Sequence, residues 1–167
     1  MVVSSSYEFP VLDALVAVHY DNLSSDDFVR KEIFRRKMLY RFKNKLIYNL
    51  STLCDVKVKK NYFKIGSLTG SLERNYDLGS QLVILANDLR KRNNLQTIEV
   101  IGVSWWICVD ATKEYIGRYG YQAEINYGCT DLVYDYKSLS SLRKASINGK
   151  GIPSLSSDVL LRYGTIR

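Results

Sequence analysis

The stretch RKEIFRRKMLYRFKNKLIYNLSTLCDVKVKKNYFK, residues 30–64, decides how the rest of the chain is interpreted. It holds twelve Lys or Arg against Glu32 and Asp55, a local net charge of +10, and it contains no Gly or Pro. The remainder of the 167 residues sums to −3, so the formal charge of +7 is one basic stretch on a nearly neutral body. Such asymmetry is typical of a surface that meets polyanions.

The same stretch predicts a long basic helix over about residues 25–53. Ser24 and Ser25 are candidate N-caps, and apolar residues then recur at helical spacing to form a face for the core. Four cations share the other side of this helix: Arg30, Lys37, Arg41 and Lys45. Beyond Asp55, valine and lysine alternate over residues 56–59, which predicts a strand with one face in solvent.

The remaining segments predict a single compact domain over residues 1–167, with a flexible tail at residues 1–9. Apolar residues at helical spacing predict a short helix from about Pro10 to Tyr20. Further elements are expected as strands at 82–86, 97–109 and 121–134, and as short helices at 110–116, 139–145 and 157–163. Helices followed by several strands indicate an α+β fold, with N-terminal helices packed on a mixed or antiparallel sheet and short C-terminal helices.

Cysteine usage and hydropathy argue against several classes of protein: disulfide-rich, zinc-binding, secreted and membrane-spanning. Cys54, Cys108 and Cys129 are odd in number and share a single histidine, His19, which supports neither a disulfide framework nor a zinc site. A Cys–His nucleophilic pair would have to use His19, and the apolar surroundings of the cysteines favour structural thiols. We therefore predict no catalytic residue, metal or cofactor, no signal peptide or membrane span, and an intracellular, cytoplasmic setting.

The basic stretch favours non-enzymatic binding of nucleic acid, with RNA preferred over DNA. Phosphate contacts by Lys and Arg supply affinity that depends on salt and carries little sequence information. The predicted contacts are Arg30, Arg35, Arg36, Lys37, Arg41, Lys45, Lys57, Lys59, Lys60 and Lys64. A small basic protein of this kind would suit a virus-encoded RNA-binding protein, such as a capsid subunit or silencing suppressor in the host cytoplasm. A charge run of this length also occurs as a plain solvated helix face.

A second hypothesis rests on Ile65-Gly66-Ser67-Leu68-Thr69-Gly70-Ser71, followed by Asp77-Leu78-Gly79 and an expected strand from Gln81 to Leu85. In outline this resembles the active-site region of the DNA polymerase beta-like nucleotidyltransferases. The resemblance implies a phosphate-binding turn at Gly66 and Ser67 and a metal-binding carboxylate at Asp77. Because Gly79 stands where that family has its second aspartate, it implies a degenerate, inactive domain.

A third hypothesis is a protein-interaction adaptor. The spacing Leu50-x-x-x-Cys54-x-x-x-Val58 is similar to a short helical box that recruits ubiquitin-ligase subunits. Trp105 and Trp106 alternate across an expected strand, so one ring is expected to face solvent or a partner protein.

Overall fold

The computed structural model describes residues 9–19, 27–52, 57–66, 78–103 and 108–130. In this part of the chain the elements follow in the order β1 (Ala14–Val18), α1 (Asp27–Phe42), β2 (Leu46–Leu50), β3 (Lys57–Lys59), β4 (Tyr62–Ile65), α2 (Leu78–Arg90), β5 (Thr97–Gly102), α3 (Asp110–Arg118) and β6 (Gln122–Thr130). The predicted helices at 139–145 and 157–163 lie outside the described residues, as does most of the predicted N-terminal tail.

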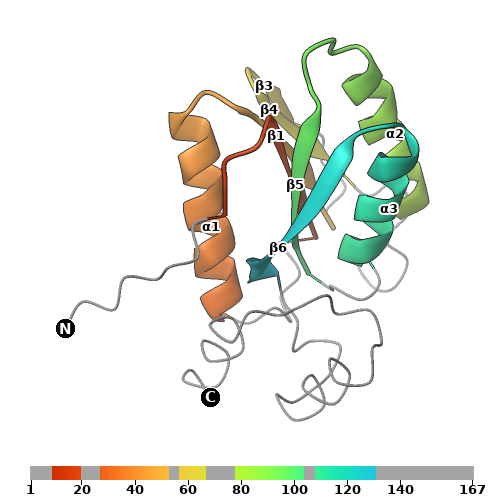
Figure 1. Ribbon diagram of the computed structural model, residues 1–167. Helices are drawn as coiled ribbons and strands as arrows, with labels where there is room; N and C mark the ends of the chain where they lie inside the picture. The colour runs from red at the N-terminus through yellow and green to blue at the C-terminus, as the bar shows by residue number, and fades with distance from the viewer. Residues whose placement is uncertain (1–8, 20–26, 53–56, 67–77, 104–107, 131–167) are drawn as a thin grey trace, which may run out of the picture.

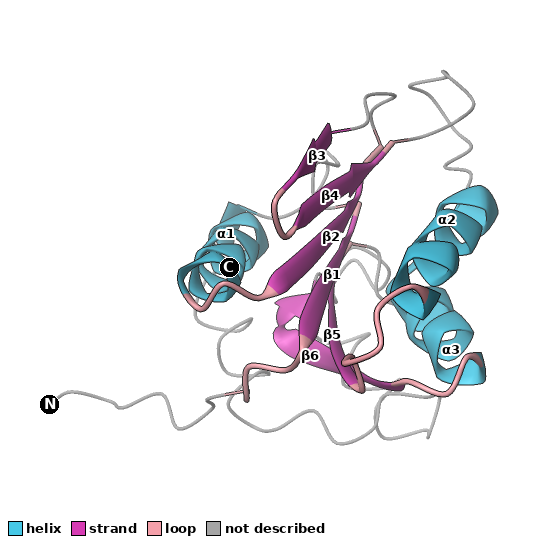
Figure 2. Ribbon diagram, turned by 90° about the horizontal axis from the view of Figure 1, so that it is seen from above, coloured by secondary structure: helices cyan, strands magenta, loops and turns pink. Residues whose placement is uncertain are grey.

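The strands form one sheet in the order β3-β4-β2-β1-β5-β6. Four of its pairings are parallel, and β3 with β4 is antiparallel. Helix α1 covers one face of the sheet while α2 and α3 cover the other (Figure 1, Figure 2). The molecule is therefore a three-layer α/β protein, and the prediction of an α+β fold on a mixed or antiparallel sheet is wrong.

The first error concerns β1, which was predicted as a helix from Pro10 to Tyr20. All five residues of β1, Ala14–Val18, are fully buried. A central parallel strand has helices on both faces, so it is apolar at every position and shows no alternation. An apolar run of this kind fits a helix and a buried strand equally well, and here the tertiary structure selects the strand.

The predicted helix over residues 25–53 ends early. Helix α1 stops at Phe42 because Asn44 takes a left-handed conformation, with φ at 55°. The Lys45 N–H bonds the Tyr40 carbonyl and the Asn44 N–H bonds the Arg41 carbonyl, which is the pairing of a Schellman motif. The chain then turns back as β2, so residues 46–50, predicted as part of the helix, form a buried strand.

The third error concerns residues 82–86, predicted as a strand. They belong to α2, whose buried residues Gln81, Leu82, Leu85, Ala86 and Leu89 recur at helical spacing. The five-residue apolar run was too short to show that period, which becomes visible only over the thirteen residues of α2.

Other elements were predicted correctly. The structure confirms a strand at Lys57–Lys59, a helix beginning at Asp110 and a strand within residues 121–134. The strand predicted over 97–109 is confirmed as β5 up to Gly102. Among the described helices, none is long and apolar enough to cross a membrane. The cytoplasmic location stays a prediction.

Candidate active site

The candidate site lies at the carboxyl-terminal end of the sheet, defined as the end where the parallel strands finish. From β1 the chain passes through α1 to β2 on one side, and later places β5 on the other side of β1. This reversal makes the β1–β5 pair the switch point of the sheet. In open α/β sheets, ligands bind in the crevice outside the strand ends at such a point.

His19 directly follows β1 at this end. Its side chain is buried, and its backbone adopts a left-handed conformation with φ at 47°. The His19 N–H donates to the Leu50 carbonyl at 2.7 Å, which holds the residue against the end of β2. A non-glycine residue kept in this sparsely populated conformation is often found where position matters for function.

Gln81, in the first turn of α2, fixes the orientation of the His19 ring. Its amide nitrogen donates to the carbonyls of Ser51 (2.7 Å) and Ile65 (3.0 Å), and its Oε1 lies 3.0 Å from His19 Nε2. Both amide hydrogens are engaged by carbonyls, so Oε1 must accept the hydrogen on Nε2. The neutral imidazole therefore carries its lone pair on Nδ1.

Gly102 brings the end of β5 close to the end of β1. Its φ is 136°, and a Cβ at this position would lie 2.0 Å from the Val18 carbonyl oxygen. The Val103 N–H then donates to the same oxygen at 2.9 Å. Only glycine combines this conformation with this approach.

Cys108 stands immediately before α3. Because β6 runs parallel to β5, α3 runs back between them and begins at the carboxyl-terminal end of the sheet. Cys108 is half-buried against the hydrophobic core, and its carbonyl accepts a hydrogen bond from Thr112 Oγ1 at 2.6 Å. The positive end of a helix dipole favours a thiolate at such a position.

Asp110 follows in the first turn of α3. Burial raises the pKa of its carboxyl above the usual range, and the neighbouring charge of Glu114 raises it further, while Lys113 opposes the shift. The switch point thus brings a thiol, an imidazole and a carboxyl to one end of the sheet. A thiol and an imidazole are the groups used for nucleophilic attack and proton transfer.

A structural or catalytic zinc site needs three or four protein ligands around one ion. The described residues contain no group of three or more His, Cys, Asp or Glu that could hold a metal ion. The only histidine of the sequence, His19, is bonded through Nε2 to an amide. No zinc site is assigned to this part of the chain.

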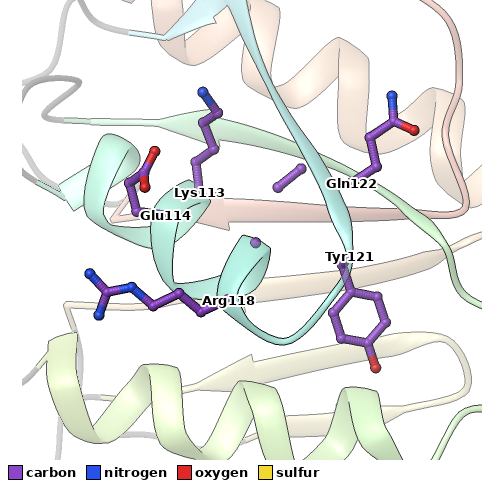
Figure 3. Close-up of a pocket in the computed structure, with 7 residues that line it drawn as sticks. Lys113, Glu114, Arg118, Tyr121 and Gln122 are labelled. Carbon is purple, nitrogen blue, oxygen red and sulfur yellow. The ribbon is translucent and has the colours of Figure 1, made fainter.

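A shallow pocket between α3 and the start of β6 lies away from this site (Figure 3). Its volume is about 400 Å³, and its labelled side chains, Lys113, Glu114, Arg118, Tyr121 and Gln122, fan outward without converging (Figure 3). Among the described residues, no thiol or imidazole lines it. It is therefore no candidate for the reaction centre.

Two of the predicted nucleic-acid-binding residues, Arg35 and Arg36, are paired with carboxylates. Arg36 points toward the sheet, where its guanidinium binds buried Glu99 at 2.7 Å. Glu99 also accepts hydrogen bonds from Tyr40 and Asn126. The positive charge of Arg36 is therefore neutralised by a buried carboxylate within the protein. Arg35 pairs with Glu32 at 2.6 Å.

The other cations of that set are spread over three elements. Arg30 and Lys37 lie on α1, Lys57 on β3 and Lys64 on β4, and the Lys37 ammonium lies 5.5 Å from the centre of the Tyr62 ring. The structure does bring four together around one pocket at the opposite end of the sheet: Arg41, Lys45, Lys59 and Lys60.

The residues of the other two hypotheses are only partly described. The nucleotidyltransferase resemblance needs a strand at residues 81–85, which is helical, and Ser67 and Asp77 lie outside the described residues while Gly66 is buried after β4. For the adaptor, Leu50 is fully buried in β2, and Cys54, Trp105 and Trp106 lie outside the described residues.

The apolar surroundings of Cys108 predict a structural thiol, and the sequence alone assigns no separate role to His19. The signal that could have identified both residues as site residues is their position in the chain. His19 closes an apolar strand, and Cys108 comes six residues after Gly102 and directly before a helix. Had residues 14–18 been recognised as a strand, both would have been placed at one end of a parallel sheet.

Comparison with known proteins places the fold among enzymes. No family model matches the sequence, and no curated protein matches it. Among solved structures, the chain is similar to a nicotinamidase from Staphylococcus aureus, with 17% identity, a TM-score of 0.53 and coverage of 85% of this chain and 97% of that one. It is also similar to a pyrazinamidase of Pyrococcus horikoshii in complex with zinc, with 15% identity, a TM-score of 0.54 and coverage of 82% and 93%.

A pyrazinamidase/nicotinamidase from Streptococcus mutans aligns with 15% identity, a TM-score of 0.50 and coverage of 81% and 96%. At these identities the similarity establishes a shared fold. That fold overturns the prediction of a non-enzymatic RNA-binding or viral protein, and the nucleotidyltransferase and adaptor alternatives with it, because its solved examples here are enzymes of the nicotinamidase type.

Proposed function

We propose that this chain is a hydrolase that cleaves the carboxamide of a small molecule, with Cys108 as the nucleophile. The observation that carries the proposal is the position of Cys108, between β5 and α3 and at the same end of the sheet as His19. The similar structures bear the names nicotinamidase and pyrazinamidase, which supports an amide as the substrate class.

The reaction follows from the groups at this end of the sheet. The Cys108 sulfur attacks the amide carbonyl carbon while its proton passes to His19 Nδ1, the nitrogen that Gln81 leaves with the lone pair. The positive end of the helix dipole lies at the start of α3 and favours the negative oxygen that forms.

Collapse of this intermediate breaks the C–N bond. The leaving nitrogen takes the proton from His19 and departs as ammonia, and a thioester to Cys108 remains. Water then attacks the thioester, passes a proton through His19 and breaks the C–S bond. The products are a carboxylic acid and the free thiol, so the enzyme returns to its starting state.

Gln81 acts as a positioning residue in this scheme. It touches no reacting atom, but its three hydrogen bonds lock the ring of His19 in one tautomer. An orienting partner behind the base is a recurring part of nucleophilic sites.

The test measures ammonia release from nicotinamide and pyrazinamide by the purified chain and by two serine variants. We expect Cys108→Ser to lose activity by about 1,000-fold or more, as removal of a nucleophile does. Cys129→Ser is the matched control, because Cys129 is a buried thiol on β6 whose sulfur contacts the Glu32 carbonyl at 3.7 Å.

Mass spectrometry of the protein quenched during turnover supplies a second readout. An acyl adduct is expected on the peptide that contains Cys108. Equal activity of the wild type and the Cys108 variant, or no hydrolysis of either amide together with no adduct, would refute the proposal.

A further inference from the structure

A pocket of about 250 Å³ lies at the amino-terminal end of the sheet, opposite the candidate active site. It is formed where the turn between α1 and β2 meets the turn between β3 and β4. The described residues that line it include no carboxylate and four cations from these segments: Arg41, Lys45, Lys59 and Lys60. This volume lies just below the range of about 300–1,000 Å³ for pockets that hold drug-sized ligands.

The positive charge of this pocket is only weakly compensated. Lys45 lies 3.8 Å from Asp13 Oδ1, at the limit of an ion pair. The other oxygen of Asp13 accepts hydrogen bonds from the Gln96 and Thr97 backbone and from Thr97 Oγ1, each at 3.0 Å. Four like charges around one small volume repel one another, and an anion placed among them removes that repulsion.

The pocket is also held in shape before any ligand arrives. Asn44 and Asn61, one from each turn, adopt left-handed conformations with φ of 55° and 59°. Asn61 Nδ2 donates to Asn44 Oδ1 at 2.8 Å and to the Asn44 carbonyl at 3.2 Å, which ties the two turns together. The Ile47 N–H donates to the Asn61 carbonyl at 2.9 Å. Backbone fixed in this way presents its flanking cations at defined positions.

We propose that this pocket binds the phosphoryl group of a small ligand, either inorganic phosphate or pyrophosphate or a phosphate ester of a small organic molecule. Arg41 offers the planar donor fork that matches phosphate oxygens, and the lysines supply further point charges. The pocket volume is sufficient for a group of this size. The site is separate from Cys108, which follows β5 at the other end of the sheet.

Isothermal titration of the whole chain with inorganic pyrophosphate, ribose 5-phosphate and ribose tests this assignment. We expect saturable binding of one phosphorylated ligand per chain, no binding of ribose, and weaker binding as sodium chloride is raised. Binding by pyrophosphate alone would assign the pocket to free phosphate ions, and binding by ribose 5-phosphate would extend it to phosphate esters. Both results support the phosphoryl site.

The decisive comparison uses two double variants that remove the same charge. Lys59→Gln/Lys60→Gln is expected to weaken binding at least about tenfold, which corresponds to the loss of a charge-assisted contact. Lys31→Gln/Lys91→Gln removes two exposed cations elsewhere and is expected to bind as the wild type does. Circular dichroism confirms that both variants fold.

Three results would overturn the proposal. One is the absence of saturable heat with every phosphorylated probe. Another is unchanged affinity in the Lys59/Lys60 variant. The last is an equal loss in both double variants, which would show diffuse attraction by net charge. None of these outcomes bears on Cys108, because amide hydrolysis is measured without phosphate.

Discussion

The two ends of the sheet are built in different ways. At the carboxyl-terminal end, His19 and Gln81 are buried and interlocked by hydrogen bonds, and Gly102 is pressed against the Val18 carbonyl. At the amino-terminal end, Lys59 and Lys60 are exposed around an open pocket. The stability of the carboxyl-terminal end depends on packing, and the properties of the amino-terminal end depend on charge. Substitutions at the two ends should therefore change stability by different amounts and respond differently to salt.

The largest expected effect is that of Gly102→Ala. A Cβ there would lie 2.0 Å from a backbone oxygen and would occupy a φ of 136°, so β1 and β5 must separate at their ends. We expect a loss of more than about 4 kcal/mol in the free energy of unfolding. Losses of this size are exceptional for single substitutions and arise from causes such as steric overlap and backbone strain. Urea denaturation followed by circular dichroism measures the loss.

Two further glycines serve as controls for this prediction. Gly117 lies within α3 with no atom within 4 Å of an added Cβ, so Gly117→Ala should stabilise by about 0.5–1 kcal/mol. Gly120 has the same open space but a φ of 89°, so Gly120→Ala should cost about 1 kcal/mol from backbone strain alone. Similar losses at Gly102 and Gly120 would show that the close approach is unimportant.

Gln81→Leu is expected to have the next largest effect. It removes the acceptor for His19 Nε2 and the donor to the Ser51 and Ile65 carbonyls, leaving buried polar groups without that partner. The expected cost is about 2–3 kcal/mol. Gln81→Glu keeps an acceptor for the ring but loses both donors to the carbonyls. If the proposed hydrolysis is observed, its pH profile should shift in Gln81→Leu, because the tautomer of His19 is no longer fixed in that variant.

Gln96→Leu is the matched control, since the Gln96 side chain is exposed. Its free energy of unfolding should stay within about 0.5 kcal/mol of the wild type. An equal cost for both leucine substitutions would contradict the role given to Gln81.

Local signals in the sequence were enough for some elements and not for others. The strand at Lys57–Lys59 shows the alternation of a strand with one face in solvent. Asp110, expected as a helix cap, lies in the first turn of α3, and Val109 takes the N-cap position. The end of α1 was missed because Asn44, in place of glycine, adopts the left-handed conformation. A helix end of this kind depends on the left-handed conformation of one residue, and the identity of a non-glycine residue does not reveal that conformation.

The candidate site could not be predicted because it depends on topology. Residues 14–18 are uniformly apolar, and only their place between β2 and β5 shows that they are a strand. If residues 14–18 are taken as a helix, nothing in the sequence places His19 and Cys108 at the same end of a sheet. The basic stretch led to the prediction of a binding surface that includes Arg36. A count of charges in the sequence does not reveal that Arg36 pairs with buried Glu99.

A smaller effect is expected for Asp13→Asn, at the amino-terminal end. The pKa of Asp13 is lowered below the ordinary value of an aspartate, mainly because the Thr97 backbone N–H donates to the carboxylate. The Gln96 N–H adds to this shift, and burial opposes it. A lowered pKa means that the ionised form stabilises the folded state above the unfolded pKa of about 3.9. That stability is lost as the pH falls through the folded pKa.

At pH 7 the Asp13→Asn variant should therefore be less stable than the wild type by about 1–2 kcal/mol, the value of hydrogen bonds to a charged acceptor. The difference should shrink once the pH drops below about 4. Denaturant titrations at several pH values measure this. A difference that is constant from pH 7 to pH 3 would show that the carboxylate charge contributes nothing.

The smallest effect, and the one of opposite sign, is expected for Lys59→Gln/Lys60→Gln without ligand. Removing two of four neighbouring cations relieves repulsion, so thermal stability should rise slightly, within about 0.5 kcal/mol. Because these side chains are exposed, the gain should vanish in high salt, which screens the repulsion in the wild type as well. Pyrophosphate should reverse the order, raising the melting temperature of the wild type above that of the variant, since a ligand stabilises only the protein that binds it. A variant that is less stable than the wild type in low salt and without ligand would mean that Lys59 and Lys60 are packed structural residues, and the contrast between the two ends of the sheet would fail.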